Sequence, residues 1–155
     1  MKVAILYICT GKYNQFFKGF FESCEKYLLK DIAQLEYYVF TDDMSLSDEA
    51  NVHLIKKEYA GFPADSLFRF DMFLQVRQEL EKTDYIYFFN SNAEFKAPVG
   101  KELLPLNGEK LVGAEWPGKR KPSSIRHFIP TNVTSIHRRI YLPGKTSHIF
   151  IIWVE

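Results

Sequence analysis

Residues 3–13 are VAILYICTGKY, an apolar run that ends in a turn containing glycine. An apolar run without polar alternation is typical of a strand that is buried on both faces, as in the centre of a parallel sheet. Further strands are predicted at residues 35–41 and 52–56, and an amphipathic helix is predicted at residues 14–29. This order predicts an α/β domain in which helices cover a mostly parallel sheet.

The next part of the chain continues this pattern. Asp65 or Ser66 is expected to cap a helix that runs to about residue 80, with one apolar face. YIYFF at residues 85–89 predicts another buried strand, and one more strand is expected at residues 110–114.

Length, charge and cysteine content exclude several classes of protein. The chain has 155 residues and a formal net charge of +1, which indicates one domain and no strong electrostatic attraction to nucleic acid. Cys9 and Cys24 lack the spacing of a metal or disulfide motif, and the first apolar run is too short to span a membrane. We therefore expect a cytoplasmic protein with no membrane span and no nucleic-acid partner.

The composition changes near Lys119. Basic residues become frequent, no acidic residue occurs from there until Glu155, and no amphipathic pattern continues. The sequence therefore predicts a nucleotide-binding α/β part at residues 1–118 and an aberrant or irregular tail at residues 119–155.

The turn after the first predicted strand is one candidate binding site. Ligands of open parallel sheets bind beyond the carboxyl ends of the strands. Gly11 allows a tight turn there, main-chain amides of the following helix could meet a diphosphate, and Tyr13 could stack on a base. An ordinary strand–helix turn is the alternative, and from these residues alone it is the more frequent one.

Polar residues after YIYFF form a second candidate. Alternation places the amides of Asn90 and Asn92 on one side of the chain, where they could bind sugar or phosphate oxygens, or could simply form a turn. Amides have no charge with which to hold a hard cation tightly, so such a site is expected to need no metal. Arg69 is a candidate diphosphate ligand because its guanidinium is planar, although such an arginine usually extends to solvent.

Several segments in series resemble glycosyltransferase family 6, which includes the histo-blood group A and B transferases. They cover about residues 3–118 and are ILYICTGKY, FFESCEKYLL, EYYVFTD, LFRFDMF, DYIYFFNSNAEF, VGKELL and LVGAEWPG. The similarity is greatest to bacterial members, which have Asn-x-Asn where others have a metal-binding Asp-x-Asp. It implies a GT-A fold and retaining transfer of galactose or N-acetylgalactosamine from a UDP-sugar to O3 of a β-galactoside, without metal or other cofactor.

The resemblance also implies roles for individual residues. The UDP and donor-sugar contacts would be made by Ile8, Cys9, Thr10, Tyr13, Arg69, Asn90 and Asn92. Trp116 lies where the family has an acceptor-side histidine, so the acceptor site departs from the family pattern. In family members the catalytic glutamate lies in a part of the sequence that would follow residue 155 of this chain. No catalytic residue is therefore assigned. We expect this chain to be truncated and inactive, or a non-catalytic UDP-binding remnant.

A shifted reading frame is one hypothesis for the tail's composition. One base earlier, the codons of residues 131–133 can encode YER, and those of residues 138–142 and 151–155 can encode QAYIP and YYMGG. Family members have these segments in the same order. A single-base deletion between about Gly118 and Phe128 would therefore account for the tail, and a genuine basic tail is the alternative.

Overall fold

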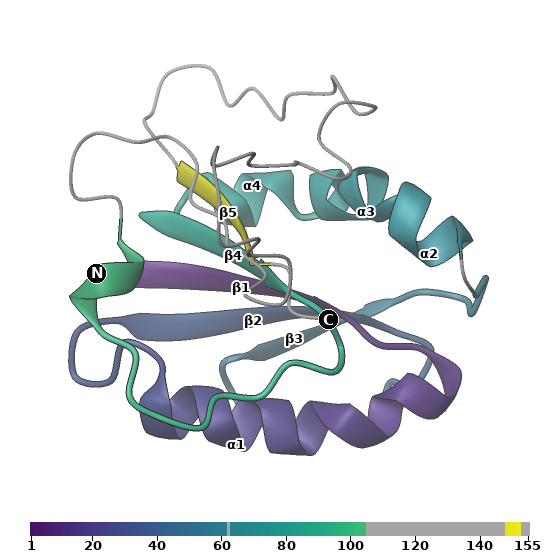
Figure 1. The fold of residues 1–155 in the computed structure, drawn as a ribbon. Coiled ribbons are helices and arrows are strands. Elements are labelled where there is room, and N and C mark those ends of the chain that lie inside the picture. Colours follow the sequence, from purple (N-terminus) through teal and green to yellow (C-terminus); the bar gives the residue numbers. More distant parts are fainter. Residues whose placement is uncertain (62, 105–147, 153–155) are drawn as a thin grey trace, which may run out of the picture.

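The computed structural model describes residues 1–61, 63–104 and 148–152 (Figure 1). Within these ranges the chain forms one five-stranded sheet in the order β3-β2-β1-β4-β5, and every pairing is parallel. The strands are β1 (Lys2–Ile8), β2 (Gln34–Thr41), β3 (Val52–Lys56), β4 (Tyr85–Phe89) and β5 (His148–Ile152). The predicted α/β fold with a parallel sheet is confirmed.

Helices cover both faces of the sheet. They are the 3₁₀ helix η1 (Gly11–Phe16), α1 (Phe17–Tyr27), α2 (Ala64–Leu67), α3 (Arg69–Gln75), α4 (Arg77–Leu80) and the 3₁₀ helix η2 (Lys101–Leu103). Figure 1 shows α1 on one face and α2, α3 and α4 on the other.

Alternation along β1 creates a core on each side of the sheet. Tyr7 packs toward α1, where its ring stacks on Phe20 at 4.3 Å. Leu6 belongs to the opposite core, together with Phe73 of α3. All four side chains are almost fully buried, and each such burial contributes about 1.5–3 kcal/mol. The two-sided burial predicted for the first strand is therefore confirmed.

The first predicted helix differs from the observed one at both ends. It begins as the 3₁₀ helix η1, and α1 ends two residues earlier than expected, at Tyr27. Leu28 is extended and forms a bridge to Val99, and Leu29 has a φ of 48° and donates its N–H to Val99 O at 2.7 Å. Pairing with this distant segment thus replaces the last helical turn.

The long helix predicted before β4 is broken into α2, α3 and α4. The breaks are at Phe68 and Val76, whose main chains leave the helical region. The predicted cap is also wrong, because Pro63 is the residue that precedes α2. Asp65 and Ser66 lie within that helix. The carboxylate of Asp65 accepts hydrogen bonds from Thr10 and Gly61, outside the helix.

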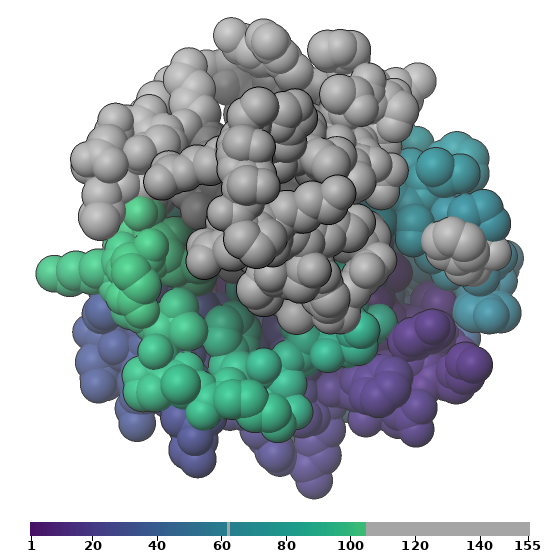
Figure 2. Space-filling model, viewed as in Figure 1, coloured from purple at the N-terminus to yellow at the C-terminus, as the bar shows by residue number. Residues whose placement is uncertain are grey.

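Strand β4 is followed by a segment that runs along α1. Figure 2 shows this segment, coloured teal to green, on the surface beside the purple and blue residues of α1. The N–H of Phe95 donates to Ser23 Oγ at 3.1 Å, which fixes the segment to the helix.

No helix in the described parts of the chain is long and apolar enough to cross a membrane.

The end of the chain contains a strand that the sequence did not predict. Residues 148–152 pair with β4 in the stretch expected to be irregular, with Ile151 beside Phe88. Their sequence, HIFII, is rich in β-branched and aromatic residues, which favour strands. The strand expected at residues 110–114 and the acceptor-side candidate Trp116 lie outside the described residues.

Candidate functional site

The carboxyl ends of β1, β2 and β4 form the edge of the sheet where ligands are expected. Ile8 lies beside Phe40 in the register of β1 and β2, and Tyr7 lies beside Phe89 in that of β1 and β4. The turns after these three strands therefore start side by side. In open parallel sheets this edge is the usual place for a ligand.

The turn after β1 offers mainly its main chain. Cys9 and Thr10 are 1% and 4% exposed, and Ile8 is half-buried, so a ligand at this turn meets few of their side-chain atoms. Burial raises the pKa of the Cys9 thiol to about 12, so the thiol is protonated at neutral pH. Gly11 follows with a φ of 55°, in the left-handed region that glycine tolerates best.

Asp42, after β2, holds this turn. The Gly11 N–H donates to both oxygens of its carboxylate, at 2.9 and 3.0 Å, and Asn14 Nδ2 donates to Oδ1 at 2.8 Å. These hydrogen bonds, that from Asn14 first, lower the pKa of Asp42. Main-chain amides of this turn were predicted to bind a diphosphate, but the Gly11 amide already binds the carboxylate of Asp42. No binding role is predicted for Asp42 from the sequence, because an aspartate at the end of a strand usually forms a turn.

Two aromatic rings lie near the turn. Tyr13 is 42% exposed on η1, as a residue that stacks on a base requires. Tyr59 is 60% exposed, and a Cβ atom added at Gly11 would lie 3.5 Å from its ring. Tyr59 could not be predicted as a candidate, because nothing in the sequence of the loop after β3 indicates that this loop folds back over the turn after β1.

The Asn90-Ser91-Asn92 segment begins where β4 ends. Asn90 is half-buried and Asn92 is exposed. The N–H of Ala93 donates to Asn90 O at 3.0 Å, which closes a turn. The segment is thus a turn that presents polar side chains at the sheet edge, so the two interpretations drawn from the sequence are compatible.

Arg69 packs toward the same strand. Its guanidinium lies 5.0 Å from the centre of the Phe88 ring, and its Nε donates to Ser66 O at 2.8 Å. The side chain is half-buried, and burial lowers its pKa. Within the described ranges no carboxylate forms an ion pair with it. Arg69 therefore does not simply extend to solvent, and it contacts the strand that Asn90 follows.

No group of three or more His, Cys, Asp or Glu residues suited to a metal ion occurs in the described parts of the chain.

The carboxylate of Asp43 accepts two hydrogen bonds from Ser45, at 2.6 and 2.9 Å, and these lower its pKa. This aspartate therefore closes the turn after β2, as strand-end aspartates commonly do.

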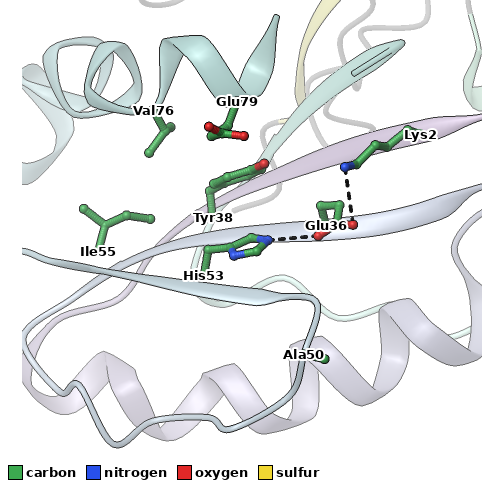
Figure 3. Close-up of a pocket in the computed structure, with 8 residues that line it drawn as sticks. All are labelled: Lys2, Glu36, Tyr38, Ala50, His53, Ile55, Val76 and Glu79. Atoms are coloured by element: carbon green, nitrogen blue, oxygen red, sulfur yellow. Dashed lines mark hydrogen bonds and ion pairs between the residues drawn. The ribbon is translucent and has the colours of Figure 1, made fainter. Parts of the chain in front are cut away.

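A separate pocket of about 450 Å³ lies on the face covered by α3 and α4 (Figure 3). Glu36 in it contacts His53 Nε2 at 2.9 Å and Lys2 Nζ at 3.6 Å. Lys2 and Glu36 lie near the amino ends of their strands, away from the edge described above. None of the residues assigned from the sequence lines this pocket.

No protein-family model matches the chain. Over 127 residues, 81% of its length, the chain is 41% identical to the O-antigen biosynthesis glycosyltransferase WbnI of Escherichia coli. The matched stretch is 53% of that protein, so the chain spans about half the length of this curated relative. The chain is therefore a homologue of a bacterial glycosyltransferase over most of its own sequence.

Proposed function

We propose that the chain is the nucleotide-sugar-binding part of a retaining glycosyltransferase of family 6. The donor is UDP-galactose or UDP-N-acetylgalactosamine, and the acceptor is a β-galactoside in a bacterial glycan. The convergence of Arg69 and Asn90 on the end of β4, beside the turn after β1, supports this proposal most directly. The homology to WbnI, named for O-antigen biosynthesis, supports the transferase class and a glycan acceptor.

In this proposal each candidate residue named from the sequence at this edge has a binding role. Tyr13 stacks on the uracil, and the main chain of residues 8–10 lies against the nucleoside. The planar guanidinium of Arg69 pairs with two oxygen atoms of the diphosphate. Asn90 and Asn92 donate hydrogen bonds to phosphate or sugar oxygens, in place of a metal ion.

Calorimetry with UDP and with each UDP-sugar tests the proposal. We expect UDP to bind whether Mn²⁺ or a chelator is present, and UMP and uridine to bind more weakly. A chain that binds none of these ligands would contradict the proposal. Incubation with a UDP-sugar and lactose then separates a transferase, which releases product, from a non-catalytic UDP-binding module, which does not.

We also propose that a single-base deletion lies between about Gly118 and Phe128. The support is that codons compatible with residues 131–133, 138–142 and 151–155 can encode family segments, in the family's order, when they are read one base earlier. Genomic DNA decides the matter, because the codons of Thr131, Asn132 and Val133 must encode YER in that frame. Any other reading there would contradict the deletion.

A further inference from the structure

An ion pair beside the turn after β1 joins Lys57, in the segment between β3 and α2, to Asp65 in the first turn of α2. Lys57 follows β3 directly, and its Nζ lies 2.8 Å from Asp65 Oδ1. The other oxygen of this carboxylate accepts the Thr10 hydroxyl at 3.3 Å and the Gly61 N–H at 3.1 Å. The two oxygens therefore differ in function, because Oδ2 joins the segment to the β1 turn and Oδ1 holds the ammonium.

Main-chain and aromatic contacts fix this segment over the turn. The N–H of Lys57 donates to Thr41 O at 2.8 Å, at the end of β2. The ring of Tyr59 lies against both Gly11 and Gly61, where added Cβ atoms would lie 3.5 and 3.3 Å from its atoms. Both glycines have positive φ, so the close approach depends on their conformation.

This arrangement brings a positive charge across the sheet. Strand β2 lies between β3 and β1, so a residue that follows β3 is ordinarily distant from the β1 turn. The ammonium of Lys57 is nevertheless separated from the Thr10 hydroxyl by only one carboxylate group. The side chains of Lys57 and Asp65 are 20% and 16% exposed, so the pair is shielded but reachable from solvent.

The charge of a diphosphate needs such a cation. Asn90 and Asn92 are neutral, and Asp42 and Asp43 add negative charge to the same edge. An anion bound there requires charged donors, which form shorter and stronger hydrogen bonds than neutral ones. Arg69 supplies one of them, on the β4 side.

We infer that Lys57 is a second diphosphate ligand, which Asp65 holds beside Thr10 until the donor replaces it. The inference rests on the proposed function. When the ammonium moves to a phosphate oxygen, Asp65 keeps its hydrogen bonds from Thr10 and Gly61 through Oδ2. The β1 turn therefore stays in place while the cation changes partner.

Calorimetry of UDP and uridine binding to four variants tests this inference. Lys57→Met should weaken UDP binding about tenfold and leave uridine binding unchanged, because uridine has no phosphate. Lys57→Arg should restore most of the loss. Asp65→Asn keeps its hydrogen-bond acceptor but loses its charge, so it should strengthen UDP binding, because Lys57 then loses its ion pair and is held only by Glu58 O at 2.6 Å. Lys82→Met is the control, because it removes the same charge from an exposed pair with Glu79 at 2.9 Å.

The outcomes separate the inference from the proposed function. Equal weakening of UDP and uridine binding by Lys57→Met would mean that Lys57 only supports the fold, and would overturn the inference. Unchanged UDP binding would overturn it too, as would weaker binding by Asp65→Asn. A wild-type chain that binds neither UDP nor uridine contradicts the proposed function itself, whatever the variants do.

Discussion

The hydroxyl of Tyr7 donates a hydrogen bond of 2.6 Å to the main-chain carbonyl oxygen of Ser91, 84 residues away in the sequence. Tyr7 is fully buried in β1, and Ser91 is the middle residue of the Asn-Ser-Asn turn. A core side chain therefore sets the position of the turn that presents both candidate amides.

Replacing Tyr7 with Phe removes this hydrogen bond and leaves the Ser91 carbonyl without its donor. We expect a loss of about 1 kcal/mol in the free energy of unfolding, measured with urea, and weaker UDP binding. Tyr87→Phe is the matched control, because the Tyr87 hydroxyl donates to Leu103 O at 3.1 Å. A similar loss of stability with unchanged UDP binding is expected for the control. Equal effects of both variants on binding would contradict the role of Tyr7.

Arg69→Met removes a half-buried guanidinium at the end of β4. UDP affinity should fall about tenfold, because hydrogen bonds from charged groups contribute roughly 1.5 kcal/mol or more. Arg77→Met removes an arginine paired with Glu81 at 2.8 Å on the surface, and should leave affinity unchanged. Calorimetry compares the UDP affinities of the two variants. If Arg69→Met binds UDP as tightly as Arg77→Met does, Arg69 has only a packing role.

Replacing both Asn90 and Asn92 with Asp tests the metal independence of the proposed site. The wild-type affinity for UDP should change less than about twofold when Mn²⁺ is removed, because neutral amides hold hard cations weakly. The double variant should bind UDP poorly in chelator and recover when Mn²⁺ is added. A wild-type chain that requires Mn²⁺ would count against this assignment.

Gly11→Ala places a side chain at a φ of 55°, 3.5 Å from the Tyr59 ring. The free energy of unfolding should fall by about 1 kcal/mol, which is the usual cost of alanine at positive φ. Gly19→Ala is the opposite case, because Gly19 lies in α1 with open space around its Cβ position. It should raise stability by about 0.5–1 kcal/mol. Urea denaturation measures the free energy of unfolding of both variants. A change in the same direction for both would contradict the prediction.

Stability should fall at alkaline pH. Burial raises the pKa of Cys9 from 9.0 to about 12, and burial also raises the pKa of Tyr7 and Tyr37. Above about pH 9 the unfolded chain releases protons that the folded chain keeps, so stability is complete below this pH and decreases toward pH 12. Urea denaturation at neutral pH and near pH 10.5 measures the decrease. The Cys9→Ala variant should show a shallower decrease, and a constant stability would exclude this linkage.

The sequence predicted elements whose signals are local. The apolar runs of β1 and β4 identify buried strands, and the three- and four-residue spacing of Phe17, Phe20 and Cys24 identifies α1. The breaks at Phe68 and Val76 had no such signal, since neither residue is a proline or glycine.

The residues of the candidate site also differ in whether a local sequence signal identifies them. Asn90 and Arg69 were predicted as candidates because Asn90 directly follows a recognisable strand and Arg69 has a planar guanidinium suited to a diphosphate. Asp65 and Tyr59 could not be predicted in this way, because their partners Thr10 and Gly11 lie far away in the sequence. A carboxylate near a helix start favours a cap locally, and only the folded chain shows that Asp65 contacts another strand's turn.

The bond between the Gly11 N–H and Asp42 has a consequence for how this edge could change in evolution. With that amide occupied, recognition of an anion depends on side chains such as Arg69 more than on the conformation of a glycine-rich loop. Single substitutions of exposed or half-buried residues can then change ligand affinity while the main-chain geometry is preserved. Related chains with this edge could therefore diverge in ligand preference without rebuilding the turn.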